Sequence, residues 1–197
     1  MEKKNATKFK LAKPGILHII YGCMWAGKTT RLKDLLYSYR GFGHKVIFFS
    51  HDRTDRSREK RINNPLIKSL TPIYIEELNK DTIIENDIKV IGIDESQFFN
   101  ERIIGFVIKY LELNKIIILS GLNGTYEAKT FGFVHNLVPY ASEIEILHAE
   151  CEECKKDGIT EDASFTARVS TNKDLVVIGD EHYMPLCANH YRKHIGK

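Results

Sequence analysis

A glycine-rich segment near the amino terminus has the composition of a phosphate-binding loop. Residues 22–29 read Gly-Cys-Met-Trp-Ala-Gly-Lys-Thr and follow the apolar run 16–20. In such a loop between a strand and a helix, backbone N–H groups surround a polyphosphate, and the positive end of the helix faces the same charge. Lys28 would neutralise the β- and γ-phosphates, and the Thr29 hydroxyl would hold Mg²⁺. The segment predicts binding of a nucleoside triphosphate; the alternative is a strand-to-helix turn that matches by chance.

Two adjacent carboxylates end a second apolar run. Asp94 and Glu95 follow residues 88–93, which read Ile-Lys-Val-Ile-Gly-Ile. Because the carboxyl ends of parallel strands line the ligand crevice, both side chains should emerge beside the phosphate loop. Asp94 has the position of an aspartate that holds Mg²⁺, often through water, and Glu95 is free to accept a proton or orient an attacking group. Such acid pairs also occur at ordinary surface turns, so the prediction of phosphoryl transfer depends on the upstream loop.

Two short motifs near the carboxyl terminus have the spacing of a metal site. Cys151 and Cys154 form a C-x-x-C pair, and Cys187 and His190 form a C-x-x-H pair. This ligand set is typical of a structural tetrahedral Zn²⁺ site with no open position for catalysis. Two unrelated pairs are the alternative. The remaining cysteine, Cys23, lies in the phosphate loop, where a helix N-terminus could lower its pKa; we expect an oxidisable packing residue.

The elements that must position these groups alternate between strand and helix. Apolar runs at 45–49, 88–93 and 115–119 predict buried strands, and apolar residues at helical spacing predict helices over 29–40 and 101–113. This alternation predicts a parallel sheet covered on both faces. The basic, polar segment 53–64 is predicted to be a mobile loop. Beyond Tyr140 the pattern changes to short strands and turns, so we expect a tail at 1–14, a nucleotide-binding α/β domain at 15–141 and a small second domain at 142–197.

The overall composition indicates a soluble intracellular protein. The 197 residues include 29 basic and 26 acidic side chains, for a net charge of +3, and this balance gives no sign of a dedicated nucleic-acid surface. The polar segment 1–8 lacks the apolar region of a targeting signal, and no segment approaches membrane-spanning length. Four cysteines without a signal peptide argue against a disulfide framework. We expect a cytoplasmic protein with no membrane or nucleic-acid partner.

Taken in order, the motifs resemble those of type II thymidine kinases over residues 15–194. The resemblance is carried by the loop 22–30, the run 91–99 (Ile-Gly-Ile-Asp-Glu-Ser-Gln-Phe-Phe), the run 120–126 (Ser-Gly-Leu-Asn-Gly-Thr-Tyr), the Phe131-Gly132 pair, the two metal-ligand pairs and the segment 163–183. It implies an α/β fold with a RecA-like P-loop core and a small zinc-ribbon β domain that carries a lasso loop.

The resemblance also implies a role for each matching position. Glu95 would be the general base toward the nucleoside 5′-hydroxyl, with Lys28 as the second catalytic residue. ATP and Mg²⁺ would be held by Gly22, Gly27, Lys28, Thr29, Thr30 and Asp94. The pyrimidine would be enclosed by Met24, Phe98, Leu122, Tyr126, Phe131, Thr166, Leu175, Val177 and Tyr183. A flat base gains stacking and apolar burial in such an enclosure, although each of these residues taken singly fits ordinary core packing equally well.

The sequence departs from the family pattern at several positions. Asn123 and Asp180 replace an aspartate and a glycine, and residues 166–168 read Thr-Ala-Arg in place of Thr-Lys-Arg. After Phe49 the family's Asp-Thr-Arg-Tyr and Ser/Thr-His motifs have no clear equivalent. Whether Arg53 or Arg56 reaches the phosphates is therefore left open.

The sequence thus predicts an ATP-dependent deoxynucleoside kinase, most closely a thymidine kinase. The resemblance further implies a homotetramer and feedback inhibition by thymidine triphosphate. One alternative is a P-loop ATPase or nucleic-acid-binding module with a structural zinc ribbon; the balanced charge and the lack of basic residues interleaved with aromatic ones around the metal-ligand pairs argue against it. Another is an inactive binding scaffold, which the intact Lys28, Thr29, Asp94 and Glu95 disfavour.

Overall fold

The main body of the protein is a six-stranded parallel sheet. The computed structural model describes residues 15–53, 69–172, 174–177 and 179–196. The strands are β1 (Ile16–Gly22), β2 (Lys45–His51), β3 (Ile73–Ile75), β4 (Ile88–Asp94), β5 (Ile116–Leu122) and β6 (Glu143–Leu147). They lie in the order β3-β2-β4-β5-β1-β6, and each adjacent pair is parallel. The predicted parallel α/β sheet is confirmed. The predicted tail 1–14 and most of the predicted basic loop, including Arg56, lie outside the described residues.

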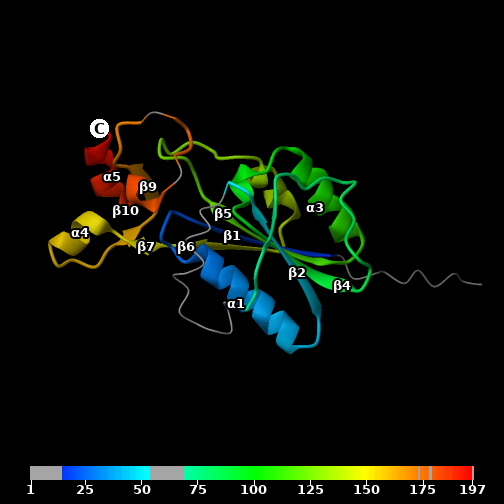
Figure 1. Ribbon diagram of the computed structural model, residues 1–197. Helices are drawn as coiled ribbons and strands as arrows, with labels where there is room; N and C mark the ends of the chain where they lie inside the picture. The colour runs from blue at the N-terminus through cyan, green and yellow to red at the C-terminus, as the bar shows by residue number, and fades with distance from the viewer. Residues whose placement is uncertain (1–14, 54–68, 173, 178, 197) are drawn as a thin grey trace, which may run out of the picture.

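Two helices cover the two faces of this sheet (Figure 1). Helix α1 (Lys28–Gly41) buries Leu32 and Leu36, one turn apart, against apolar side chains of β1, β2, β4 and β5. Helix α3 (Arg102–Glu112) buries Ile103, Phe106 and Val107 against the other face of the same strands. Burial of each such side chain stabilises the fold by about 1.5–3 kcal/mol. Neighbouring residues of one strand therefore enter different core clusters, which explains the continuous apolar runs in the sequence.

The carboxyl-terminal elements form a small structure at one end of the sheet (Figure 1). Strands β7 (Ala149–Glu150) and β8 (Asp162–Ala163) form one antiparallel pair, and β9 (Phe165–Arg168) and β10 (Tyr183–Leu186) form another. Short helices α4 (Glu152–Lys156) and α5 (Ala188–His194) follow β7 and β10. The buried cluster of this region includes Cys23 and is contacted by Ala26, so it packs directly on the predicted phosphate loop.

Strand β6 connects the sheet to the small carboxyl-terminal structure. It begins just beyond the boundary expected at residue 142, and it pairs with β1 from His18 opposite Glu143 to Gly22 opposite Leu147. Residues 143–147 therefore form an edge of the main sheet. Three 3₁₀ segments, η2 (Ser96–Phe98), η3 (Val134–Tyr140) and η4 (Asp180–His182), complete the described elements. Among the helices of the described ranges, none has both the length and the apolar character that a bilayer-spanning helix needs.

Candidate active site

The glycine-rich loop lies between the carboxyl end of β1 and the start of α1, as the sequence predicts. Gly27 caps the helix with φ of 81°, in the left-handed region that glycine adopts without strain. The Lys28 ammonium group donates a hydrogen bond to the Cys23 carbonyl at 2.6 Å. A positive charge, the start of a helix and a glycine-rich turn therefore occupy one place, which is the arrangement that binds phosphate groups.

The structure brings the two predicted Mg²⁺ ligands, Thr29 and Asp94, together, and it adds Ser120, for which the sequence predicts no role. The Thr29 hydroxyl donates to Asp94 Oδ2 at 2.7 Å. The Ser120 hydroxyl donates to the other carboxylate oxygen of Asp94. Asp94 is the last residue of β4, Ser120 lies on β5 and Thr29 on the first turn of α1. Oxygen ligands next to a phosphate-binding loop fit Mg²⁺, which is bound by carboxylate oxygens together with phosphate oxygens.

Glu95 follows Asp94 in a strained backbone conformation. Its φ of 51° and ψ of 39° lie in the left-handed region, which costs a residue other than glycine on the order of 1–3 kcal/mol and is found mainly at functional sites. The Gln97 amide donates to Glu95 Oε2 at 2.5 Å, and its oxygen accepts the Leu122 N–H at 3.1 Å. Gly121 makes room for this contact, because a Cβ there would lie 3.0 Å from Gln97 Oε1. Gln97 thus orients the Glu95 carboxylate, a role that sequence reasoning missed although Gln97 stands in the motif.

The predicted base-enclosing residues occur in three groups of contacts. Phe98 and Phe131 meet edge to face, with ring centroids 5.6 Å apart. The Met24 N–H donates to Thr166 Oγ1 at 3.0 Å, and both residues are buried. The third group lies around the Tyr183 hydroxyl, which accepts the Val177 N–H at 3.0 Å. The remaining members are Leu122, held at its N–H by Gln97, Tyr126, whose ring lies against Arg168, and Leu175, whose side chain is 54% exposed.

Hydrogen bonds attach the small carboxyl-terminal structure to the loops of the sheet. The Cys23 thiol donates to the Ala163 carbonyl at 3.2 Å, and the Asn123 amide donates to the Ser164 carbonyl at 2.9 Å. Asn123, a departure from the family pattern, therefore has a structural partner here. Burial raises the pKa of the Cys23 thiol, with opposing but smaller contributions from backbone hydrogen bonds and Lys28. The pKa thus moves opposite to the lowering that a helix N-terminus could cause, because desolvation is the largest contribution, and the full burial of Cys23 fits the expected packing residue.

The four predicted metal ligands converge at the amino-terminal ends of α4 and α5. Their ligand atoms all lie within 4.8 Å of one another. His190 Nδ1 lies 3.6, 3.3 and 3.5 Å from the sulfur atoms of Cys151, Cys154 and Cys187, and the last two sulfurs are 3.9 Å apart. Tetrahedral coordination with ordinary Zn–S and Zn–N bond lengths would place two sulfurs about 3.8 Å apart and a sulfur and a nitrogen about 3.6 Å apart. These distances fit a cluster that could hold zinc.

The thiols of this cluster differ in acidity. Burial, followed by the sulfurs of Cys151 and Cys187, raises the pKa of Cys154 to about 12. Desolvation acts on Cys151 in the same sense, but hydrogen bonds from the backbone N–H groups of Cys154 and Cys187 lower its pKa to about 6. Metal binding requires all three as thiolates and releases their protons.

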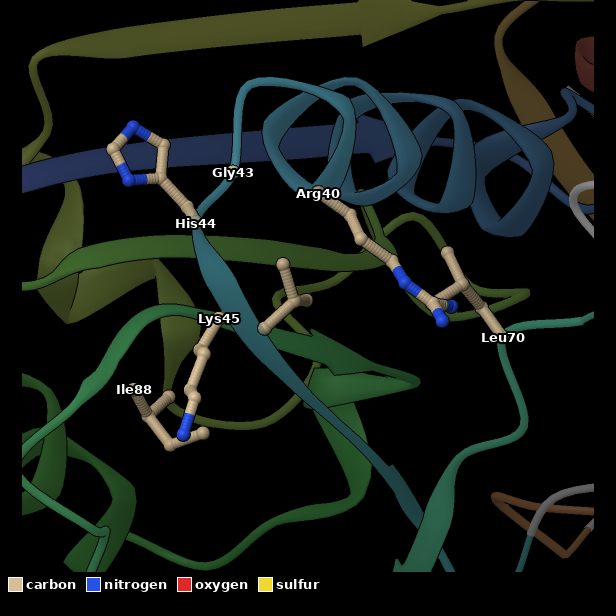
Figure 2. Close-up of a pocket in the computed structure, with 7 residues that line it drawn as sticks. Arg40, Gly43, His44, Lys45, Leu70 and Ile88 are labelled. Atoms are coloured by element: carbon tan, nitrogen blue, oxygen red, sulfur yellow. The ribbon is translucent and has the colours of Figure 1, made fainter.

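A hollow of about 530 Å³ lies at the other end of the sheet (Figure 2). Its lining residues are Arg40, Gly43, His44, Lys45, Val46, Leu70 and Ile88. Lys45 and Ile88 are the first residues of β2 and β4, and the Lys45 ammonium is paired with Asp87. Ligands of open parallel sheets bind beyond the carboxyl ends of the strands. This hollow at the amino ends is therefore not the candidate active site.

Comparison with known proteins agrees with this site. A family model described as thymidine kinase matches residues 15–191, a range that contains the phosphate loop, the carboxylate pair and the metal-ligand cluster. The thymidine kinase of rabbit fibroma virus (strain Kasza) is 31% identical over 178 residues, which cover 90% of this chain and 96% of the relative. That of fowlpox virus (strain NVSL) is 32% identical over 181 residues, covering 88% and 94%. That of African swine fever virus is 30% identical over 188 residues, covering 93% and 96%. The chain belongs to the thymidine kinase family.

Proposed function

We propose that the protein transfers the γ-phosphoryl group of ATP to the 5′-hydroxyl of thymidine, and also of deoxyuridine. The product is the nucleoside monophosphate, and the reaction serves pyrimidine deoxynucleoside salvage for DNA synthesis. The observation that carries this proposal is the bond between Thr29 and Asp94, which joins the phosphate loop to the acid pair. The relatives named above support thymidine as the acceptor.

The residues around the loop hold ATP and Mg²⁺ in this proposal. The phosphates lie on the backbone N–H groups of the segment from Gly22 to Thr30, and the Lys28 ammonium moves from the Cys23 carbonyl to the β- and γ-phosphates. Asp94 and Thr29 hold Mg²⁺, which when bound neutralises charge on the phosphate oxygens. Catalysis is then mainly positioning and electrostatic stabilisation.

Glu95 is the general base in this proposal. It is placed one residue beyond the Mg²⁺ ligand, and its carboxylate is held by the Gln97 amide. The 5′-hydroxyl gives its proton to Glu95 as its oxygen attacks the γ-phosphorus, and the bond to the β-phosphate oxygen breaks. The pyrimidine ring of the nucleoside lies among Met24, Phe98, Leu122, Tyr126, Phe131, Thr166, Leu175, Val177 and Tyr183.

The small carboxyl-terminal structure binds zinc in this proposal. Cys151, Cys154, Cys187 and His190 supply four ligands, which leaves no position for substrate, so the metal stabilises the fold. We assign residues 15–141 to nucleotide binding and 142–197 to zinc and the lasso, with β6 contributed by the second region to the sheet. The tail 1–14 belongs to neither of these two regions.

Assembly, regulation and location follow as parts of the same proposal. A nucleotide with both a thymine base and a triphosphate can contact the base enclosure and the phosphate loop together, which supports feedback inhibition by thymidine triphosphate. Ile144 and Ile146 are exposed on the edge strand β6, and exposed apolar edges favour self-association, which supports a homotetramer. We further propose a cytoplasmic protein with no membrane or nucleic-acid partner.

The test is transfer of label from γ-labelled ATP to a panel of nucleosides. Thymidine and deoxyuridine should give labelled monophosphates, and deoxyadenosine and deoxyguanosine should not, because a bicyclic base does not fit the enclosure. Lys28→Met should abolish transfer to every acceptor. Release of labelled phosphate without any labelled nucleotide would instead identify an ATPase and overturn the proposal.

A further inference from the structure

A single buried guanidinium group organises the described part of the segment between β9 and β10, where the lasso loop is expected. Arg168 is the last residue of β9 and is 6% exposed. Its Nη1 donates to the carbonyls of Asn172, at 3.1 Å, and Asp174, and its Nη2 donates to the carbonyl of Leu175 at 3.1 Å. Three backbone carbonyls from residues 172–175 therefore point at one side chain, and these contacts fix the path of the chain after β9.

The same guanidinium group lies against two tyrosine rings from different parts of the protein. Arg168 Cζ is 3.9 Å from the centre of the Tyr126 ring and 5.0 Å from that of the Tyr183 ring. Its Nη2 also donates to the Tyr183 hydroxyl at 2.6 Å, and that hydroxyl accepts the Val177 N–H. Tyr126 lies in the loop after β5, Val177 lies between β9 and β10, and Tyr183 is the first residue of β10. Arg168 thus contacts Tyr126, Leu175 and Tyr183 of the proposed base enclosure directly, and it is linked to a fourth member, Val177, through the Tyr183 hydroxyl.

The charge of Arg168 is balanced in an unusual way. Over the ranges that the structure describes, its hydrogen bonds go to carbonyl and hydroxyl oxygens, and no ion pair with a carboxylate is present. Its buried Nε has no hydrogen-bond partner there. Burying a charge without a carboxylate partner is costly, and carbonyl dipoles and ring faces offset only part of that cost. Such a group is an expensive way to stabilise a loop, so its geometry points to a role in the site.

We propose that Arg168 is a positioning residue that sets the affinity for the nucleoside by holding residues 172 and 174–177 and the Tyr126 and Tyr183 rings in their binding arrangement. The inference rests on the proposed nucleoside kinase function. It acts through the enclosure and not on the transferring phosphoryl group, because every described contact of the guanidinium is with these residues. Lysine cannot replace it, since one ammonium group cannot donate to several carbonyls in a plane and also stack between rings.

The kinetic test compares Arg168→Lys and Arg168→Ala with the same changes at Arg40, an exposed arginine at the other end of the sheet. Loss of several hydrogen bonds to a charged group should raise the KM for thymidine roughly 10- to 100-fold. The kcat at saturating thymidine and the KM for ATP should change less than about 3-fold, because the thymidine complex and the transition state lose the same binding energy. The Arg40 variants should match the wild type.

A chemical rescue separates positioning from general loss of structure. Millimolar guanidinium ion should lower the thymidine KM of Arg168→Ala toward the wild-type value and should leave Arg40→Ala and the wild type unchanged. Amide hydrogen exchange of residues 174–177 should be faster in Arg168→Ala and should slow again with guanidinium. Zinc content should stay equal in all variants.

Several results would overturn the inference. They are an unchanged thymidine KM in both Arg168 variants, an equal rise of the ATP and thymidine KM, or no effect of guanidinium on either KM or exchange. Absence of nucleoside phosphorylation in the wild type would instead refute the proposed function. The exchange measurement on residues 174–177 needs no activity, so the two failures can be told apart.

Discussion

Replacement of Glu95 by glutamine tests the proposed general base most directly. Glutamine keeps the size of the side chain and one oxygen acceptor for the Gln97 amide, whose own oxygen is held by the Leu122 N–H. The local hydrogen bonds can therefore persist, and the left-handed backbone at residue 95 is no more strained for glutamine than for glutamate. Only the basicity is lost. Since general-base catalysis typically contributes about 10²–10⁴-fold, kcat should fall by that factor, while the KM for ATP stays within about 3-fold.

The assay is single-turnover transfer of label from γ-labelled ATP to thymidine. Glu95→Asp is the matched control, because it keeps the base but withdraws it by one methylene, so its activity should lie between those of the wild type and Glu95→Gln. Asp94→Asn should behave differently, with a raised Mg²⁺ requirement, since it removes a proposed Mg²⁺ ligand. Near wild-type kcat in Glu95→Gln, with an unchanged unfolding midpoint, would show that another group takes the proton.

Three further results are expected. Cys187→Ser should lower bound zinc from one per chain toward zero, measured by metal analysis of protein purified without chelator, and should destabilise the fold; a wild type without zinc would refute the assignment. Thr166→Val leaves the buried Met24 N–H without its acceptor, so chemical denaturation should show a loss of about 1–3 kcal/mol that Thr166→Ser does not show. Burial, and then the nearby Arg53 charge, lower the pKa of His51 below its usual 6.5. The unfolded chain therefore binds a proton that the folded chain does not, and the free energy of unfolding should fall as pH drops from about 6.5 through the lower folded pKa. His51→Gln should reduce this pH dependence of unfolding, and His44→Gln, at an exposed position, should not.

The sheet and the meeting of its functional groups were predictable because both follow from local patterns. Continuous apolar runs mark strands buried on two faces, and parallel strands necessarily bring their carboxyl ends to one edge. The phosphate loop after β1 and Asp94 at the end of β4 therefore had to lie near one another. The meeting of the C-x-x-C and C-x-x-H pairs was predictable for a similar reason, since two pairs with three-residue spacing need only one contact between them.

Other features depend on contacts that no local pattern encodes. Strand β6 alternates polar and apolar residues, so it resembled the short strands that follow it and not the continuous apolar strands of the sheet. Ser120 meets Asp94 across two strands, and Gln97 meets Leu122 across 25 residues. The raised pKa of Cys23 reflects burial under the carboxyl-terminal structure, which the sequence of the loop alone does not reveal. In the sequence, Arg168 is notable only as part of the departure at residues 166–168. That several backbone carbonyls accept hydrogen bonds from its side chain is visible only in the structure.

The attachment of the carboxyl-terminal structure to the phosphate loop has a thermodynamic consequence. The Cys23 and Met24 groups of the loop bond to Ala163 and Thr166. These two residues lie on β8 and β9, which pair with β7 and β10, the strands that precede the metal-ligand residues. Two binding equilibria that share such contacts are reciprocal, so a factor by which zinc tightens nucleotide binding is the factor by which nucleotide tightens zinc binding. When zinc is scarce, molecules engaged with nucleotide would keep their metal longest, and idle molecules would unfold and be degraded first. The lifetime of the protein would in this way depend on the supply of both zinc and nucleotide.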